Sequence, residues 1–155
     1  MIRYLTAGES HGPQLTGIVE GVPAGLPITE DEIAQHLIRR QKGYGRGGRM
    51  AFEKDYAEIS SGVRFGKTTG APIAMQMPNR AHEKDDSNWP KVLAKEGDGE
   101  DVEKITVPRP GHADLTGVQK YRYDDIRPAI ERSSARETAM RVACSSVARK
   151  FLKYF

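Results

Sequence analysis

Two histidines stand on turns shaped by glycine or proline, and each is a candidate for proton transfer. His11 lies in the segment GESHG at 8–12, directly after a predicted strand. The flanking glycines would let the backbone turn tightly and approach a ligand. His112 closes the segment PRPGH at 108–112, just before a predicted helix. Imidazole exchanges protons near neutral pH, so both positions suit general acid–base work; a polar turn with an incidental histidine is the alternative for each.

A stretch of basic residues could bind an anionic ligand. Five basic side chains occur there without an acid: Arg39, Arg40, Lys42, Arg46 and Arg49. Guanidinium groups bind phosphate and carboxylate through two parallel hydrogen bonds, so the stretch predicts an anion site. A solvated basic loop and a nucleic-acid contact are the alternatives. Only Tyr44 interleaves with the arginines, so the stacking pattern of a nucleic-acid binder is weak.

The segment RSSAR at 132–136 is a second candidate anion site, because it precedes a predicted helix. Exposed backbone N–H groups and the positive end of a helix dipole favour anions. The hydroxyls of Ser133 and Ser134 and the guanidinium groups of Arg132 and Arg136 would add to that. An ordinary capping box with surface arginines is the alternative. The sequence has no metal-ligand spacing, phosphate-binding loop or dinucleotide glycine motif, so we expect no metal site.

Length and composition are those of a single soluble domain. The 155 residues include 29% charged and 37% hydrophobic side chains, and the net charge is +3. No apolar run approaches the roughly 20 residues that a bilayer span needs, and no signal peptide is visible. Cys144 is the single cysteine, which excludes an internal disulfide and fits a reducing compartment. We expect this thiol to be a small core residue.

Periodicity and turn residues predict the elements that must position these groups. Strands are expected at 3–7, 15–22, 58–65 and 72–77, with a hairpin turn at 67–70 between the last two. Helices are expected at 29–40, 114–121 and 134–153, and capping boxes are expected at Thr29 with Glu32 and at Ser134 with Glu137. The segment 79–104 is expected to be a long loop with one helical turn at 92–94. We expect His36 and His82 at the surface.

Taken together and in this order, the motifs resemble those of the chorismate synthase family. The similarity covers essentially the whole chain, and the first and the last two motifs are the most specific. The matching segments are GESHG at 8–12, GVPAG at 21–25, RRQKGYGRGGRM at 39–50, SGV at 61–63, TGAPI at 69–73, RPGHAD at 109–114 and ERSSARETA at 131–139.

The resemblance implies an enzyme and a fold. The family converts 5-enolpyruvylshikimate 3-phosphate to chorismate and phosphate by an anti 1,4-elimination, the last common step of aromatic amino acid biosynthesis. It uses reduced FMN without net redox change. The implied fold is α+β, with helices sandwiched between antiparallel β-sheets. The resemblance further implies a cytoplasmic homotetramer, NADPH as a possible reductant, and no nucleic-acid or membrane partner.

The resemblance also implies roles for individual residues. His11 would protonate the departing phosphate, and His112 would protonate the reduced flavin. The cations expected around the substrate's phosphate and carboxylates are Arg40, Arg46 and Arg49, with Arg39 and Arg136 as helpers. The side chains expected to contact FMN are Arg132, Ser133 and Ser134. The residues expected at an NADP phosphate are Arg40 and Arg46.

Two features differ from the family pattern. Family members are well over twice as long, so residues 1–155 would form the N-terminal part of the domain. The absent C-terminal half would supply further contacts, including an Arg-His-Asp motif, and this part alone would be incomplete for catalysis. The segment ACSS at 143–146 replaces a run of alanine and glycine, which bears on helix packing and not on the chemistry. A basic anion- or RNA-binding module without catalysis is the alternative function, and a steep salt dependence would mark it.

Overall fold

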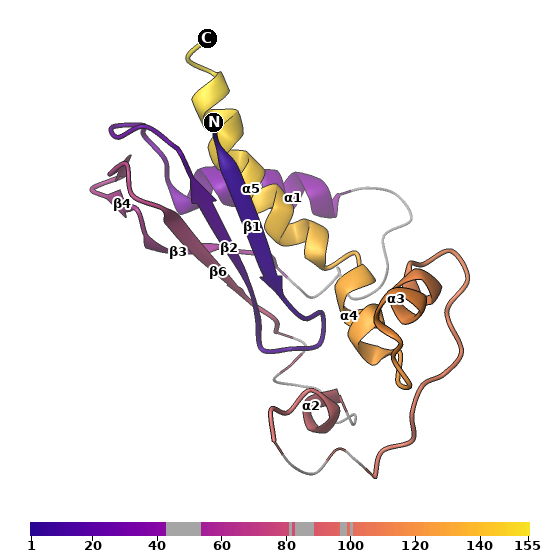
Figure 1. Cartoon of the computed structure of the whole chain (residues 1–155). Coiled ribbons are helices and arrows are strands. Elements are labelled where there is room, and N and C mark those ends of the chain that lie inside the picture. The colour runs from indigo at the N-terminus through magenta and orange to yellow at the C-terminus, as the bar shows by residue number, and fades with distance from the viewer. Residues whose placement is uncertain (43–53, 81, 83–88, 97–98, 100) are drawn as a thin grey trace.

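The fold is built on a four-stranded antiparallel sheet with the strand order β1-β2-β6-β3 (Figure 1). The computed structural model describes residues 1–42, 54–80, 82, 89–96, 99 and 101–155. The strands of the sheet are β1 (Arg3–Gly8), β2 (Gln14–Glu20), β6 (Ile73–Pro78) and β3 (Glu58–Ser61). A separate two-stranded ribbon pairs β4 (Val63–Arg64) with β5 (Lys67–Thr68).

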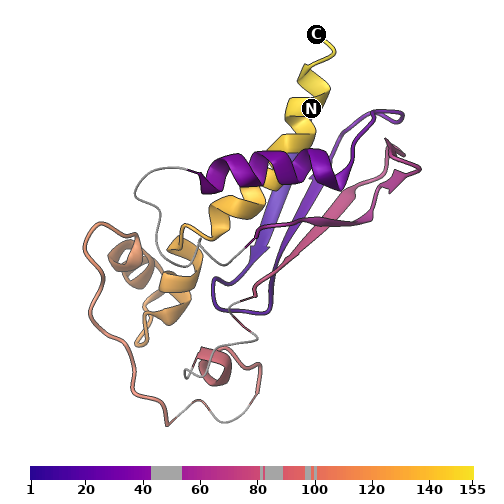
Figure 2. The same cartoon turned by 180° about the vertical axis from the view of Figure 1, so that it is seen from behind.

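Helices cover one face of this sheet. Seen from behind, α1 (Glu30–Gln41) lies in front of α5 (Glu137–Leu152), and the sheet lies beyond them (Figure 2). Two shorter helices, α3 (Asp114–Tyr121) and α4 (Arg127–Ser133), pack together past the end of the sheet, and α2 (Trp89–Val92) is a single turn. The α+β class is therefore confirmed. In the described ranges, no helix has the length and apolar character needed to cross a bilayer.

The core lies between the sheet and the two long helices. On β2, Leu15 and Val19 are buried and pair in register with Met77 and Ile73 of β6. Successive strand residues point to opposite faces, which is why Ile18 is exposed. The helices add buried side chains at three- and four-residue spacing, which are Ile33 and Leu37 of α1 and Met140, Ala143 and Val147 of α5.

Helix α5 approaches the backbone of β2 closely at Gly17. A Cβ atom placed on Gly17 would lie 2.6 Å from the sulfur of Cys144 and 2.7 Å from that of Met140. Cys144, in the segment at 143–146, thus packs closely against the sheet at Gly17. Burial raises the pKa of the Cys144 thiol to about 11, so the group stays protonated and acts as a small core residue.

We expect Gly17→Ala to lower the free energy of unfolding by about 1–3 kcal/mol, because the new methyl group overpacks this contact. Urea denaturation measures the loss. Cys144→Ala removes one of the two clashing sulfurs, so the double variant should recover part of the stability lost by Gly17→Ala. Strictly additive effects of the two substitutions would contradict the contact.

Two of the predicted helices are confirmed, one of them together with its capping box. At the start of α1, the Thr29 hydroxyl accepts from the Glu32 N–H and the Glu32 carboxylate accepts from the Thr29 N–H, both at 3.3 Å. This is the predicted capping box. Helix α3 begins and ends at the predicted residues, 114 and 121. The predicted helical turn at 92–94 occurs slightly earlier, as α2.

The predicted hairpin turn at 67–70 is wrong, although the two strands that it was expected to join do pair antiparallel, as β3 and β6. The chain reverses at Phe65 and Gly66, whose φ angles of 54° and 72° are those of a tight two-residue turn. Lys67 and Thr68 form the strand β5 instead. Thr68 is buried, and its hydroxyl is satisfied there because it donates to the Pro23 carbonyl at 2.6 Å and accepts from the Leu26 N–H at 2.9 Å. Local composition predicted a turn at Thr68, but hydrogen bonds to the distant 23–26 turn hold this residue in a strand.

The predicted capping box at the start of the last helix is also wrong. The chain forms α4, which was not predicted, and α5 begins only at Glu137. The Ser134 hydroxyl donates to Ser10 at 2.9 Å and accepts from the Arg136 N–H at 3.2 Å. The Glu137 carboxylate accepts from Arg132 at 3.0 Å. Both side chains that would have capped the helix therefore hold other segments in place.

Candidate functional site

The turn that follows β1 carries His11, which contacts a buried carboxylate on α4. The Nδ1 atom of His11 lies 2.6 Å from one oxygen of Glu131, and the His11 backbone N–H donates to the other oxygen at 2.7 Å. The Glu131 side chain is fully buried, whereas 29% of the His11 side chain is exposed. The imidazole is therefore oriented by Glu131 and keeps a solvent-accessible edge.

Two further side chains enclose the histidine. The indole of Trp89 on α2 stacks on the His11 ring, with the centroids 4.2 Å apart and the planes inclined by 5°. His82 places its Nδ1 atom 2.9 Å from the His11 carbonyl, and since a carbonyl only accepts, the His82 ring donates. The prediction that His82 lies at the surface is wrong in this respect, because the residue is half-buried against the candidate site.

The 8–12 turn is anchored on the junction between α4 and α5. Ser10 accepts from Ser134, and Arg132 donates to the Gly8 carbonyl at 3.0 Å. Burial raises the pKa of the Glu9 carboxyl, the Glu131 carboxylate adds to the rise, and Arg132 opposes it. Two of the motifs predicted to carry chemistry, 8–12 and 132–136, are thus in direct contact.

The turn that carries His112 is anchored on the same α4 end. Asp114, which is fully buried, accepts from the Arg109 guanidinium at 2.8 and 3.0 Å and from the Arg109 N–H at 3.1 Å. The Ser133 hydroxyl donates to the same carboxylate at 2.9 Å. The His112 ring is exposed, with its Nδ1 atom 3.2 Å from the Pro110 carbonyl. Within the described residues, the two candidate histidines share an anchoring segment but make no contact with each other.

We expect Asp114→Asn to change how stability depends on pH. Hydrogen bonds from Arg109 hold the pKa of Asp114 far below its ordinary value, and Ser133 adds to this. A carboxyl with a depressed folded-state pKa stabilises the fold above its unfolded pKa of about 4, and that contribution is lost as the pH falls further. The urea midpoints of the variant and the unaltered protein should therefore differ at about pH 6 and converge toward about pH 2. The exposed Asp124→Asn is the control, and a gap that does not change with pH would contradict the prediction.

Two of the predicted substrate arginines meet at one buried carboxylate. Arg136 donates to Asp55 and, at 2.8 Å, to the amide oxygen of Asn79. Arg40 donates to the other oxygen of Asp55 at 3.4 Å and to the Ala135 carbonyl at 2.7 Å. The side chains of Asp55, Arg136 and Arg40 are 1%, 7% and 10% exposed. Two guanidinium groups therefore share the carboxylate of Asp55 beside the α5 N-terminus.

The other predicted arginines are placed differently. Arg39 is exposed in the last turn of α1, and neither Asp55 nor Asn79 contacts it. Arg46 and Arg49 lie outside the described residues. The structure therefore brings Arg40 and Arg136 together and separates Arg39 from that pair.

Residues expected to contact FMN lie at one wall of a pocket of about 370 Å³ between α3 and α4. Its lining includes the rings of Tyr121 and Tyr123 and, from the expected set, Arg132 and Ser133. An apolar wall with a cation and a hydroxyl at its edge suits a planar ring system that carries a phosphate. Ser134 does not line this pocket and instead bonds Ser10. The placement of Arg132 and Ser133 at this pocket thus fits a flavin nucleotide. Ser134 instead links the α4–α5 junction to the 8–12 turn.

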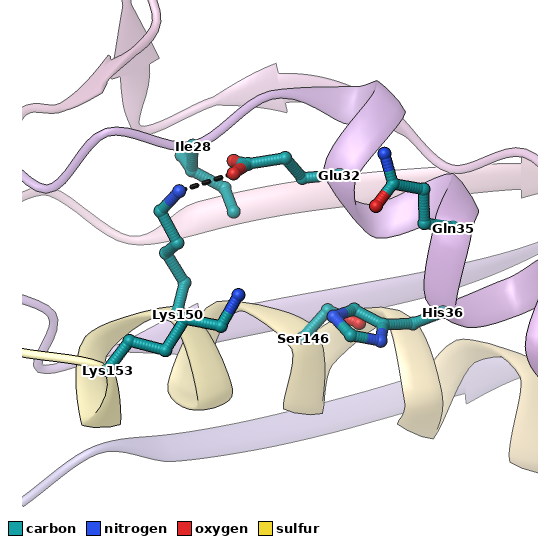
Figure 3. Close-up of a pocket in the computed structure, with 7 residues that line it drawn as sticks. All are labelled: Ile28, Glu32, Gln35, His36, Ser146, Lys150 and Lys153. Carbon is teal, nitrogen blue, oxygen red and sulfur yellow. Dashed lines mark hydrogen bonds and ion pairs between the residues drawn. The ribbon is translucent and has the colours of Figure 1, made fainter.

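A second pocket, of about 70 Å³, lies between α1 and α5 on the helical side of the molecule (Figure 3). Lys150 crosses it to pair with Glu32, the capping-box residue of α1. His36, expected at the surface, is half-buried at its wall. Burial lowers the pKa of His36, and the nearby Arg149, Arg39 and Lys153 lower it further. None of the residues predicted to carry chemistry lines this pocket.

Sequence reasoning missed several residues of the site. Glu131 stood at the start of the matching motif ERSSARETA without an assigned role, and nothing in the local sequence pointed to a histidine partner. Asp55 and Asn79 carry no local pattern at all. Trp89 is the only tryptophan of the chain, which was the one available signal in the 79–104 segment. In the described residues, no group of three or more His, Cys, Asp or Glu side chains could hold a metal ion.

Comparison with known proteins identifies the family. The chorismate synthase family model matches residues 2–155. The chorismate synthases of Salinibacter ruber and Chlorobaculum tepidum are each 62% identical over 100% and 99% of this chain, which spans 39% and 38% of their lengths. A crystal structure of chorismate synthase superimposes with a TM-score of 0.72 at 46% identity, over 99% of this chain and 35% of that one. The chain belongs to the chorismate synthase family.

Proposed function

We propose that these residues form the N-terminal part of a chorismate synthase, which eliminates phosphate from 5-enolpyruvylshikimate 3-phosphate to give chorismate. The observation that carries the proposal is His11, whose ring is held by the buried Glu131 on a turn anchored to the α4–α5 junction. The same junction bears the residues expected to contact FMN. Family membership supports this assignment, and the contacts supply its physical basis.

His11 acts as the general acid for the departing phosphate. With Nδ1 engaged by Glu131, the nitrogen that can deliver a proton is Nε2. Phosphate leaves more readily once it is protonated, so a positioned imidazole lowers the barrier to elimination. The exposed part of the ring gives a polar substrate access to it.

The cluster around Asp55 contributes the positive charge that the polyanionic substrate needs. Arg40 and Arg136 are held rigidly by Asp55, Asn79 and the Ala135 carbonyl. Cations fixed before the substrate arrives stabilise developing charge without reorganisation. In this proposal Arg46 and Arg49 also bind the substrate's phosphate and carboxylates, with Arg39 of the last turn of α1 as a helper.

Arg132 and Ser133, which line the pocket between α3 and α4, would hold FMN, and Ser134 joins their segment to the His11 turn. When bound, reduced FMN supplies electron density to the elimination without net redox change. His112, which is exposed on its turn, would serve as the proton donor toward the bound cofactor. Asp114 keeps this turn in place through Arg109 and Ser133.

We further propose a cytoplasmic homotetramer in which NADPH, contacting Arg40 and Arg46, reduces the flavin.

A chimera tests the proposal. Residues 1–155 replace the matching part of the Salinibacter ruber chorismate synthase, to which they are 62% identical. The folded chimera, with reduced FMN in anaerobic buffer, should release phosphate and form chorismate. A folded chimera that binds FMN but forms no chorismate would overturn the proposal. If the chain instead bound RNA at physiological salt, with a steep salt dependence and no response to flavin, the non-catalytic alternative would stand.

A further inference from the structure

We propose that Glu131 is the positioning residue of His11, and that it fixes the proton on Nδ1 so that Nε2 alone faces the reaction. The inference rests on the proposed function, since it concerns the proton donor of that elimination. The family resemblance assigned a role to His11 and none to Glu131. The assignment comes from the contacts between the 8–12 turn and α4.

Both oxygens of Glu131 are used on the same residue. One accepts from the backbone N–H of His11 at 2.7 Å, and the other lies 2.6 Å from the ring nitrogen Nδ1. A carboxylate accepts hydrogen bonds, so the Nδ1 atom must carry the hydrogen in this contact. The pair therefore fixes the position of the backbone, the rotation of the ring and the tautomer together.

Burial makes this arrangement specific. The Glu131 side chain has no exposed surface and lies on a helix, so it cannot rotate away without leaving a buried charge uncompensated. Trp89 stacks on the ring and restrains its tilt. A hydrogen bond to the His11 backbone N–H alone would suffice to hold the turn. A purely structural role for Glu131 does not explain why its second oxygen contacts the His11 ring.

The chemical consequence concerns where the proton can be exchanged. With Nδ1–H directed into the protein, a neutral His11 presents the lone pair of Nε2, and a charged His11 presents the Nε2 proton. Carboxylate partners that set the tautomer of a catalytic histidine act in this way in other enzymes, where loss of the correct tautomer strongly reduces turnover. Glu131 would thereby maintain one exchange site and one direction of proton transfer.

The tautomer can be observed directly by nitrogen NMR of the unaltered protein labelled with ¹⁵N-histidine. The chain has four histidines, and His82 and His112 face carbonyl oxygens through Nδ1 and serve as internal references. We expect the neutral His11 ring to carry its hydrogen on Nδ1. A neutral His11 with its hydrogen on Nε2 would overturn the inference, and this measurement needs no variant to fold.

The variant Glu131→Gln gives the second readout. Glutamine keeps the shape but offers one accepting oxygen in place of two, so it cannot serve both the backbone N–H and Nδ1–H. We expect the His11 ring signals to change tautomer while those of His82 and His112 stay unchanged. In the chimera, kcat should fall by at least about tenfold with the substrate KM within about threefold. Unchanged ring signals in Glu131→Gln would overturn the inference.

The exposed Glu20→Gln, which removes a carboxylate that pairs with Arg3 at the surface, is the matched control and should leave both readouts unaltered. The two experiments also separate the two proposals. If the chimera forms no chorismate but His11 carries its hydrogen on Nδ1, the proposed function fails and the positioning role stands. If chorismate forms and the tautomer is the other one, the positioning role fails.

Discussion

Replacing His11 by alanine is expected to lower the turnover number of the chimera by about 10²–10⁴-fold, the usual range for loss of a general acid. The substitution removes the imidazole that Glu131 orients while leaving the backbone N–H contact to the same carboxylate intact. The turn should therefore keep its path. Initial rates of phosphate release, measured at saturating substrate with reduced FMN, give the comparison.

Two checks keep this result interpretable. Trp89 is the only tryptophan of the chain and stacks on His11, so a change in its fluorescence reports that the ring has gone from its place. His36→Ala removes a histidine from the separate pocket between α1 and α5 and should not alter turnover. A His11→Ala chimera with unchanged turnover would remove His11 from the reaction.

Asp55→Ala should be among the most destabilising single substitutions in this part of the chain, with an expected loss of about 3–5 kcal/mol in the free energy of unfolding. The Asp55 side chain is 1% exposed and is shared by Arg136 and Arg40, whose side chains are 7% and 10% exposed. Removing the carboxylate takes away the counter-charge that these two mostly buried guanidinium groups share. Equilibrium denaturation by urea measures the difference.

The exposed aspartate Asp124, whose nearest cation is Lys104 at 4.0 Å, provides the comparison. Surface pairs of this kind contribute little, so Asp124→Ala should unfold at nearly the same urea concentration as the unaltered protein. Equal midpoints for Asp55→Ala and Asp124→Ala would show that the Asp55 cluster does not stabilise the fold. Asp55→Asn keeps the side-chain volume but loses the charge, and we expect it to lose most of the same stability.

The sequence by itself determined the elements whose causes are local. Thr29 and Glu32 are three residues apart, and their reciprocal hydrogen bonds depend on that spacing alone. The strand β2 and the helix α5 follow from backbone periodicity, which is why both elements were predicted, although their bounds differ from the predicted ones by up to three residues. The turns that carry His11 and His112, and the family itself, were likewise readable from glycine, proline and motif order.

Tertiary structure alone decided which partners those residues have. Glu131 lies 120 positions from His11, and Asp55 lies 81 positions from Arg136, so no pattern within a window of sequence could pair them. The same holds for Ser134, whose hydroxyl bonds Ser10 instead of capping a helix. Hydrogen bonds and ion pairs form between whichever groups the packed elements bring within about 3 Å. The orientation of the candidate acid and the charge of the arginine cluster are therefore properties of the assembled fold.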